Sequence, residues 1–182
     1  MLAAVLAFGM NLPAEAAFLV ARGGKAKCVI VRQTGATVTE SNAVRELAET
    51  LEKITGAKFE VRTEADGRVP KKAIVVGPGA AARALFPEVP LDKLGADELV
   101  MKVRNGRLLL AGGRPRGTLY AVNRFLQEQG GARWWTPWAA SLPWRDRLRV
   151  PDLNTRYQPP FEYREPFWYA GFEPRWKTRN GA

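Results

Sequence analysis

Short apolar runs separated by turn residues predict a series of strands along this chain. Residues 28–31 and 73–76 are continuous apolar runs rich in Val and Ile, which is typical of buried strands. The other predicted strands are residues 18–21, expected to pair with 28–31, residues 58–63, where apolar and charged positions alternate, and residues 133–136 and 148–150, expected to close the sheet.

A β-hairpin is the strongest local prediction. Residues 98–104 and 107–111 both have the composition of strands, and Asn105-Gly106 lies between them. Asn-Gly favours the type I′ turn, whose twist matches that of two antiparallel strands. We therefore expect these two runs to pair with each other.

The first long helix is predicted from apolar residues that recur at helical spacing over residues 43–54. Ser41 or Asn42 can cap its start, and Gly56 can end it. Charged residues such as Glu46 are expected on its exposed side.

A second helix is predicted over residues 117–129, with Gly130-Gly131 as its end. Hairpins mixed with two long helices indicate an α+β fold. We expect a mostly antiparallel sheet that the two helices cover on one face.

The composition excludes several classes of active site. The chain of 182 residues has no histidine and a single cysteine, Cys28, so it holds no Ser-His-Asp triad, no histidine general base and no histidine or multi-cysteine zinc site. We therefore expect no metal and no cofactor. The formal net charge of +10 is uneven, because residues 1–100 carry 13 basic and 12 acidic side chains whereas residues 101–182 carry 15 and 6.

The two ends of the chain differ in composition from its centre. Residues 1–17 are apolar and finish in a small-x-small pattern, which indicates a signal peptide or an apolar leader, and hence a secreted or periplasmic protein. No stretch reaches the ~20 apolar residues needed to span a membrane. A proline-rich stretch marks the other boundary, so we expect a compact domain over residues 18–154, followed by a linker and the start of another unit over residues 155–182.

Each of two glycine-rich segments has both a functional and a structural interpretation. Residues 73–82 show the outline of a dinucleotide site, a strand followed by G-x-G-x-x-A and a helix-like run, but Pro78 and the shortness of that run favour a simple turn. Residues 112–118 could present backbone N–H groups and the guanidinium groups of Arg114 and Arg116 to an anion, or could form only a tight connection.

The basic, tryptophan-rich C-terminal part has three interpretations. Its side chains could bind single-stranded nucleic acid, or they could bind sugar rings. In the third interpretation the tryptophans are structural: the side chains of Trp134 and Trp135 point to opposite faces of a strand, one into the core and the other toward a following domain. Basic residues are dispersed along the sequence, so we do not expect nucleic-acid binding. Glu162, Glu165 and Glu173 could in principle form a glycosidase acid and base pair, but too few residues surround them to build a pocket.

Several motifs in a fixed order resemble one family. They are LEKITG at residues 51–56, AIVVG at 73–77, GGRPRGTLYAV at 112–122 and GARWWTP at 131–137. Together they resemble the N-terminal domain of bacterial α-glucuronidase-like and β-hexosaminidase-like glycoside hydrolases. The resemblance implies a small α+β accessory domain of the hexosaminidase domain 2 type, with catalysis carried by a (β/α)₈ barrel that follows it.

The same resemblance implies roles for the C-terminal residues. Residues 160–165 look like the first strand of the barrel, and an arginine on that strand holds sugar hydroxyls in the hexosaminidase-like relatives. The resemblance therefore assigns Arg164 to substrate binding. The catalytic carboxylates would lie beyond Ala182, so the chain is expected to be truncated at the start of the barrel.

Our main hypothesis is thus a non-catalytic accessory domain of an exported glycoside hydrolase that acts in polysaccharide breakdown. Its partners would be its own C-terminal catalytic barrel and a polysaccharide or oligosaccharide substrate, with no nucleic acid and no membrane span. The residues expected at the interface with the barrel are Arg133, Trp134, Trp135 and Trp138. The alternative is a stand-alone carbohydrate- or anion-binding module that uses surface Trp residues with Arg114 and Arg116.

Overall fold

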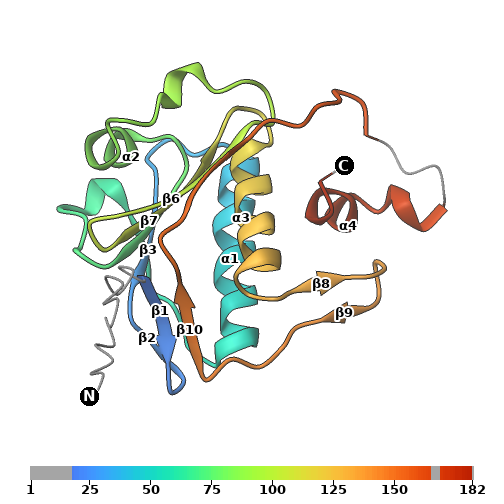
Figure 1. Cartoon of the computed structure of the whole chain (residues 1–182), viewed down its shortest axis with the longest axis horizontal. Helices are drawn as coiled ribbons and strands as arrows, with labels where there is room; N and C mark the ends of the chain where they lie inside the picture. The colour runs from blue at the N-terminus through green and yellow to red at the C-terminus, as the bar shows by residue number, and fades with distance from the viewer. Residues whose placement is uncertain (1–17, 165–168, 182) are drawn as a thin grey trace, which may run out of the picture.

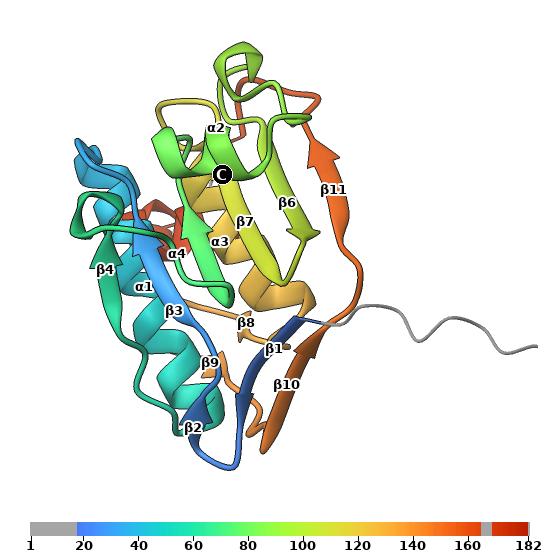
Figure 2. The same cartoon turned by 90° about the vertical axis from the view of Figure 1, so that its left-hand side faces the viewer.

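The computed structural model describes residues 18–164 and 169–181. The leader predicted at residues 1–17 lies outside the described residues. The described chain forms a six-stranded sheet with two long helices on one face, a three-stranded sheet beyond one end of it, and a two-stranded hairpin on the helix side (Figure 1, Figure 2).

The six-stranded sheet has the order β11-β6-β7-β5-β3-β4. Its strands are β3 (Val29–Arg32), β4 (Val61–Thr63), β5 (Ala73–Val76), β6 (Leu99–Arg104), β7 (Arg107–Gly112) and β11 (Asn154–Tyr157). The three-stranded sheet has the order β10-β1-β2, and consists of β1 (Phe18–Arg22), β2 (Lys25–Ala26) and β10 (Arg147–Val150); the hairpin pairs β8 (Arg133–Trp134) with β9 (Ala140–Ser141). The helices are α1 (Val38–Thr55), α2 (Ala80–Leu85), α3 (Gly117–Glu128) and α4 (Pro174–Arg179), with 3₁₀ turns η1 (Glu64–Asp66), η2 (Leu91–Lys93) and η3 (Tyr169–Phe172).

The main sheet is mixed, so the prediction of a mostly antiparallel sheet is wrong. β4, β3, β5 and β7 run parallel, and β6 and β11 are antiparallel to their neighbours. The long helix α1 connects β3 to β4 and returns the chain, so that the second strand runs in the same direction as the first. The continuous apolar runs of β3 and β5 are themselves typical of parallel strands covered on both faces. The chain is therefore an α/β domain with two main helices.

The first strand pairs with β10 and β2, and the prediction that it pairs with β3 is wrong. Gly23 and Gly24 both have positive φ, 59° and 66°, so the chain turns back at once and β2 lies next to β1. The predicted hairpin is confirmed as β6 and β7, with positive φ at both Asn105 and Gly106.

The helix α1 begins earlier than predicted. Its N-cap is Thr37, whose hydroxyl accepts a hydrogen bond from the backbone of Glu40, while the Glu40 carboxylate accepts one from the backbone of Thr37. The predicted caps, Ser41 and Asn42, lie inside the helix. Gly56 ends it as predicted, with a φ of 68°.

Side chains of the parallel strands alternate between two cores. Ile30, Ile74 and Leu110 belong to the larger core, which α1 and α3 cover and to which the three-stranded sheet contributes Phe18, Val20, Leu148 and Val150. Val31 and Val75 point to the other face and join a smaller core with residues of α2 and η2. Both faces of the sheet are thus buried.

The C-terminal segment returns to the helix side of the domain. After β11, residues 158–164 contain no strand, so the strand predicted at 160–165 does not form in its described part; Glu165 lies outside the described residues. The short helix α4 then packs against α3 (Figure 1). Among the helices of residues 18–164 and 169–181, none is long and apolar enough to cross a membrane.

Candidate functional site

The carboxyl ends of β3, β5 and β7 meet at one edge of the sheet, where both glycine-rich segments lie. This is the edge at which parallel sheets commonly bind ligands. A cavity of about 470 Å³ lies there, and its lining includes Gln33, Gly79 and Arg114. This edge therefore holds Arg114, one of the two predicted anion contacts.

The carboxylate of Glu64 occupies the start of α2, where the dinucleotide outline would place a phosphate. It accepts hydrogen bonds from the backbone N–H groups of Thr34 (2.9 Å) and Ala81 (2.7 Å). These donors are thus taken by an anion of the chain itself. In addition, α2 is only 6 residues long. The arrangement supports the turn interpretation and not the dinucleotide site.

The glycines at this edge are explained by close packing. A Cβ on Gly79 would lie 2.5 Å from the Cβ of Gln33, and one on Gly77, whose φ is 95°, would lie 2.9 Å from the same side chain. In the second segment, a Cβ on Gly113 would lie 1.9 Å from the carbonyl oxygen of Gly95. No ligand is needed to account for these glycines.

Arg114 and Arg116, the predicted anion contacts, bind carboxylates of the chain. The Nε atom of Arg114 lies 3.1 Å from the buried Glu40 carboxylate. Arg116 donates two hydrogen bonds to Asp97, at 3.2 and 2.7 Å, and its guanidinium lies 5.4 Å from the centre of the Tyr120 ring. Both arginine side chains stay partly exposed, so contact with an external anion remains a prediction.

The buried carboxylates of the described residues all have arginine partners. They are Glu40, bound by Arg114; Glu46, bound by Arg175 and Arg179; Asp97, bound by Arg116 and Arg164; and Glu98, bound by Arg156.

The arginine partners lower the pKa of two of these carboxylates, Glu98 and Glu40. The hydrogen bond from Arg156 holds the pKa of Glu98 below its ordinary value. Burial alone would raise the pKa of Glu40, but the hydrogen bonds from Arg114 and Thr37 outweigh it, and the pKa is lowered. A general acid needs a raised pKa, so neither carboxylate has the property that acid catalysis requires.

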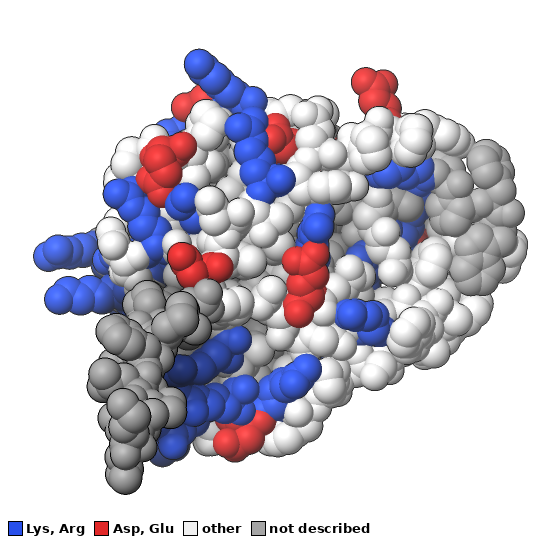
Figure 3. Space-filling view, viewed as in Figure 1, with Lys and Arg blue, Asp and Glu red and all other residues white. Residues whose placement is uncertain are grey.

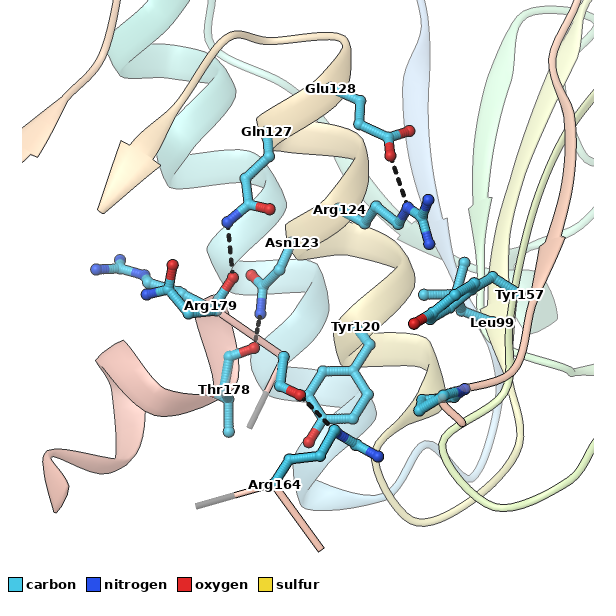
Figure 4. Close-up of a pocket in the computed structure, with 13 residues that line it drawn as sticks. Leu99, Tyr120, Asn123, Arg124, Gln127, Glu128, Tyr157, Arg164, Thr178 and Arg179 are labelled. Carbon is cyan, nitrogen blue, oxygen red and sulfur yellow. Dashed lines mark hydrogen bonds and ion pairs between the residues drawn. The ribbon is translucent and has the colours of Figure 1, made fainter. Parts of the chain in front are cut away.

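Arg164, the predicted substrate contact, lines a second cavity of about 470 Å³ between α3 and the C-terminal segment (Figure 4). Its guanidinium donates to the carbonyl oxygens of Gly181 (2.8 Å) and Phe161, and lies 3.2 Å from the Asp97 carboxylate. It also lies 5.6 Å from the centre of the Tyr120 ring, and burial raises the pKa of that tyrosine. Other residues of the wall are Leu99, Asn123, Arg124, Gln127, Glu128 and Tyr157.

The helix α4 is held on α1 and α3 by polar contacts. Glu46 of α1, expected on an exposed face, is buried beneath α4 and binds Arg175 (2.8 Å) and Arg179 (2.5 Å). On α3, Asn123 and Gln127 donate to the last carbonyls of α4, at 3.0 and 2.9 Å (Figure 4). The signal for this site in the sequence is weak, because a glutamate on a helix is usually solvated.

The tryptophans predicted at an interface lie on and beside the β8–β9 hairpin. Trp134 is buried; its carbonyl oxygen accepts from the indole of Trp176 (2.9 Å), and its ring lies 4.9 Å from the Arg179 guanidinium. Trp135 and Trp138 are 63% and 80% exposed. The predicted alternation of Trp134 and Trp135 between buried and exposed positions is therefore confirmed.

Arg133 and the three C-terminal glutamates have local contacts. Arg133 is exposed and donates to the carbonyl oxygens of Gln127 and Ala132, both at 2.7 Å, near the end of α3. Glu173 caps α4, Glu162 is exposed, and Glu165 lies outside the described residues. In the part of the chain that the structure describes, no three Cys, Asp or Glu side chains gather as metal ligands would.

The fold is shared with part of a glycoside hydrolase. The structure of a family GH115 4-O-methyl-α-glucuronidase with specificity for decorated arabinogalactans matches 80% of this chain with a TM-score of 0.61 and 17% sequence identity. A GH20 exo-β-N-acetylglucosaminidase from Vibrio harveyi matches 83% of the chain with a TM-score of 0.46, also at 17% identity. No protein-family model matches the chain, and no curated protein matches it.

The match with the α-glucuronidase confirms the predicted resemblance at the level of the fold. The chain spans 19% of the length of that enzyme and 18% of the length of the Vibrio enzyme.

Proposed function

We propose that this chain is a non-catalytic accessory domain of an exported glycoside hydrolase, of the α-glucuronidase or hexosaminidase kind, that acts in polysaccharide breakdown. The observation that carries the proposal is the fold, which is shared with about a fifth of an α-glucuronidase chain. In this proposal, residues 18–154 are the accessory domain, residues 155–182 lead into a catalytic barrel, and residues 1–17 direct export.

The arginine-bound carboxylates support a role without catalysis. Glycoside hydrolysis needs one carboxylic acid with a raised pKa beside a second carboxylate. The buried carboxylates of the described residues are instead paired with arginines, and Glu40 and Glu98 have lowered pKa values. The catalytic pair is then expected in the barrel.

The exposed aromatic residues on the helix side support an interface with that barrel. Trp135 and Trp138 lie next to the β8–β9 hairpin, which projects on the same side as α4 (Figure 1). Large exposed aromatic residues of this kind dominate protein interfaces when a partner covers them. Arg133, which is exposed, would extend this interface, whereas the buried Trp134 would support it from beneath.

The test is to express the open reading frame that encodes this chain with any coding sequence that adjoins it, and to assay release of uronic acid or N-acetylhexosamine from simple glycosides. We expect activity, and we expect the double variant Trp135→Ser/Trp138→Ser to lower the Tm of the whole protein. Val38→Ser, which changes an exposed apolar residue at the start of α1, is the control and is expected to leave the Tm unchanged. A reading frame without a further domain would overturn the proposal.

Arg164 is the residue through which this chain would contact the sugar. Its place in the cavity with Tyr120 and Tyr157 supports this assignment. In the active longer protein, Arg164→Gln is expected to raise KM. Arg116→Gln removes the other arginine of Asp97 and is the matched control, because Arg116 does not line this cavity. Equal KM values for the two variants would refute the role of Arg164.

A stand-alone carbohydrate- or anion-binding module is the second candidate, and the cavity beside Arg164 is the observation that favours it. Its tyrosine rings and side-chain amides are groups that bind sugars. Because no tryptophan of the described residues lines this cavity, the test is isothermal titration calorimetry of the chain with acidic oligosaccharides, which should then show heat of binding. The absence of binding heat would exclude this candidate.

A further inference from the structure

The three-stranded sheet carries a row of cationic side chains on its outer face. Arg147 of β10 lies directly opposite Arg22 of β1, and Arg22 lies directly opposite Lys25 of β2. Residues directly opposite in antiparallel strands point to the same face. Arg149, two residues after Arg147, adds a fourth cation on that face. We call these four residues the cation row.

The local structure turns the cation row toward solvent. In β10, Arg147 and Arg149 are exposed, whereas Leu148 and Val150 between and beyond them are buried in the larger core. The row is therefore fixed by the same alternation that buries the other face. Arg22 and Lys25 are exposed as well, on either side of the glycine turn.

No ion pair neutralises the cation row within the described residues. Arginines elsewhere in the domain, such as Arg83 and Arg104, lie within 2.7 Å of a carboxylate oxygen. The acidic residue closest in sequence, Asp146, has no ion pair with the row. Figure 3 shows Lys and Arg side chains gathered over the lower end of the molecule, with an acidic side chain beside them, where β1, β2 and β10 lie in Figure 1.

Like charges directly opposite each other destabilise a sheet. Arg22 has a cation opposite it on both sides, so the arrangement costs stability in the free protein. A bound polyanion would remove that cost.

We propose that the cation row binds the carboxylate groups of an acidic polysaccharide, a polymer that contains uronic acid residues. Guanidinium groups bind carboxylates with paired hydrogen bonds, and strands ~4.8 Å apart set the cations at regular steps across the sheet. None of the exposed large hydrophobic residues lies on β1, β2 or β10. The nearest of them in sequence, Trp144, offers a single ring, whereas binding of single-stranded nucleic acid stacks successive bases on several aromatic side chains. The choice of a polysaccharide rests on the proposed function, because a hydrolase domain with this surface would hold its enzyme on an acidic substrate.

The test measures binding of the chain to polygalacturonate, to neutral galactan and to a 20-nucleotide single-stranded DNA between 20 and 200 mM NaCl. The row variant is Arg22→Gln/Lys25→Gln/Arg147→Gln. The control variant, Arg45→Gln/Arg68→Gln/Lys93→Gln, removes the same charge from exposed positions outside the three-stranded sheet. We expect the wild type to bind polygalacturonate and the control variant to bind it equally well. The row variant should bind it on the order of tenfold more weakly. The magnitude of its slope of log K against log salt should be smaller by about two to three, because three cationic contacts are lost.

A single substitution adds a second readout. Arg22→Glu places a carboxylate between two cations, so it should weaken polygalacturonate binding by about as much as the row variant does while raising the Tm by about 2 °C. A gain of stability together with weaker binding separates the row from a merely unfolded variant.

Three results would overturn the inference. They are equal losses in the row and control variants, tighter binding of the DNA than of polygalacturonate at the same salt concentration, and no binding of either polymer. Each leaves the proposed function standing, because hydrolase activity of the longer protein is measured separately. Conversely, if no catalytic domain adjoined the chain, the proposed function would fail, but the chain would still be expected to bind polygalacturonate.

Discussion

Glu46 is expected to control whether α4 stays docked, and the substitution Glu46→Gln tests this. The carboxylate is buried between α1 and α4, with its side chain 8% exposed, and binds Arg175 and Arg179. Glutamine keeps the size of the side chain but removes the charge that both arginines need. Arg179, only 17% exposed, is then left without its counter-ion.

The magnitude follows from the exposure of the two arginines. A hydrogen-bonded pair with a mostly buried arginine contributes about 1.5 kcal/mol, the lower end for hydrogen bonds to charged groups. Arg175 is 54% exposed, so solvent screening reduces its share to about 0.5 kcal/mol. The sum of about 2 kcal/mol corresponds to roughly a 30-fold larger opening constant for α4.

Trypsin measures this opening directly, because α4 contains Arg175, Lys177 and Arg179. When opening and closing are fast, the cleavage rate follows the population of the open form. We expect Glu46→Gln to be cleaved in α4 roughly 30 times faster than the wild type, as measured by mass spectrometry over time.

The control is Glu49→Gln, which removes the more exposed carboxylate 3.2 Å from Arg175. It should change the rate less than about threefold, since exposed ion pairs contribute little. Equal cleavage rates in the wild type and in Glu46→Gln would refute the reasoning that Glu46 holds α4 in place.

Three further outcomes are expected. The first concerns Glu98, whose pKa is lowered by Arg156. This ion pair stabilises the fold fully above the ordinary pKa of a glutamate, and its contribution is lost as the pH falls through the lowered value. Thermal unfolding from pH 7 to pH 3 should therefore show a smaller loss of Tm in Glu98→Gln than in the wild type. Burial raises the pKa of the Cys28 thiol to about 12, so a thiol reagent at pH 8 should label it only after denaturant is added; rapid labelling of the native chain would contradict its burial. Gly79→Ala brings a Cβ to 2.5 Å from the Cβ of Gln33 and should lower the free energy of unfolding by about 1–3 kcal/mol, as measured in urea, and a neutral effect would show that this edge of the sheet can relax.

The local elements of this protein are largely determined by its sequence. Asn105-Gly106 between two apolar runs specifies the β6–β7 hairpin, and the apolar spacing of the two long helices specifies their buried faces. The Gly56 end of α1 and the alternation of Trp134 and Trp135 follow from the same local chemistry. These features depend on neighbours within a few residues, which a sequence displays directly.

The pairing of strands was decided by the tertiary structure. A helix between two strands permits parallel or antiparallel neighbours, and only packing of α1 on the sheet places β3 beside β4 in the same direction. Likewise, β1 has the composition to pair with β3, but its glycine turn and the distant β10 take both of its edges.

The candidate sites needed the tertiary structure even more. Arg114, Arg116 and Arg164 can be found in the sequence as cations, but their carboxylate partners come from residues up to 74 positions away. Arg22 and Arg147 read as dispersed charges along the chain, and the pairing of β1 with β10 places them side by side. Sequence determines which residue types exist and which local shapes they favour, whereas charge constellations arise from long-range pairing, because electrostatic interactions act through space and not along the chain.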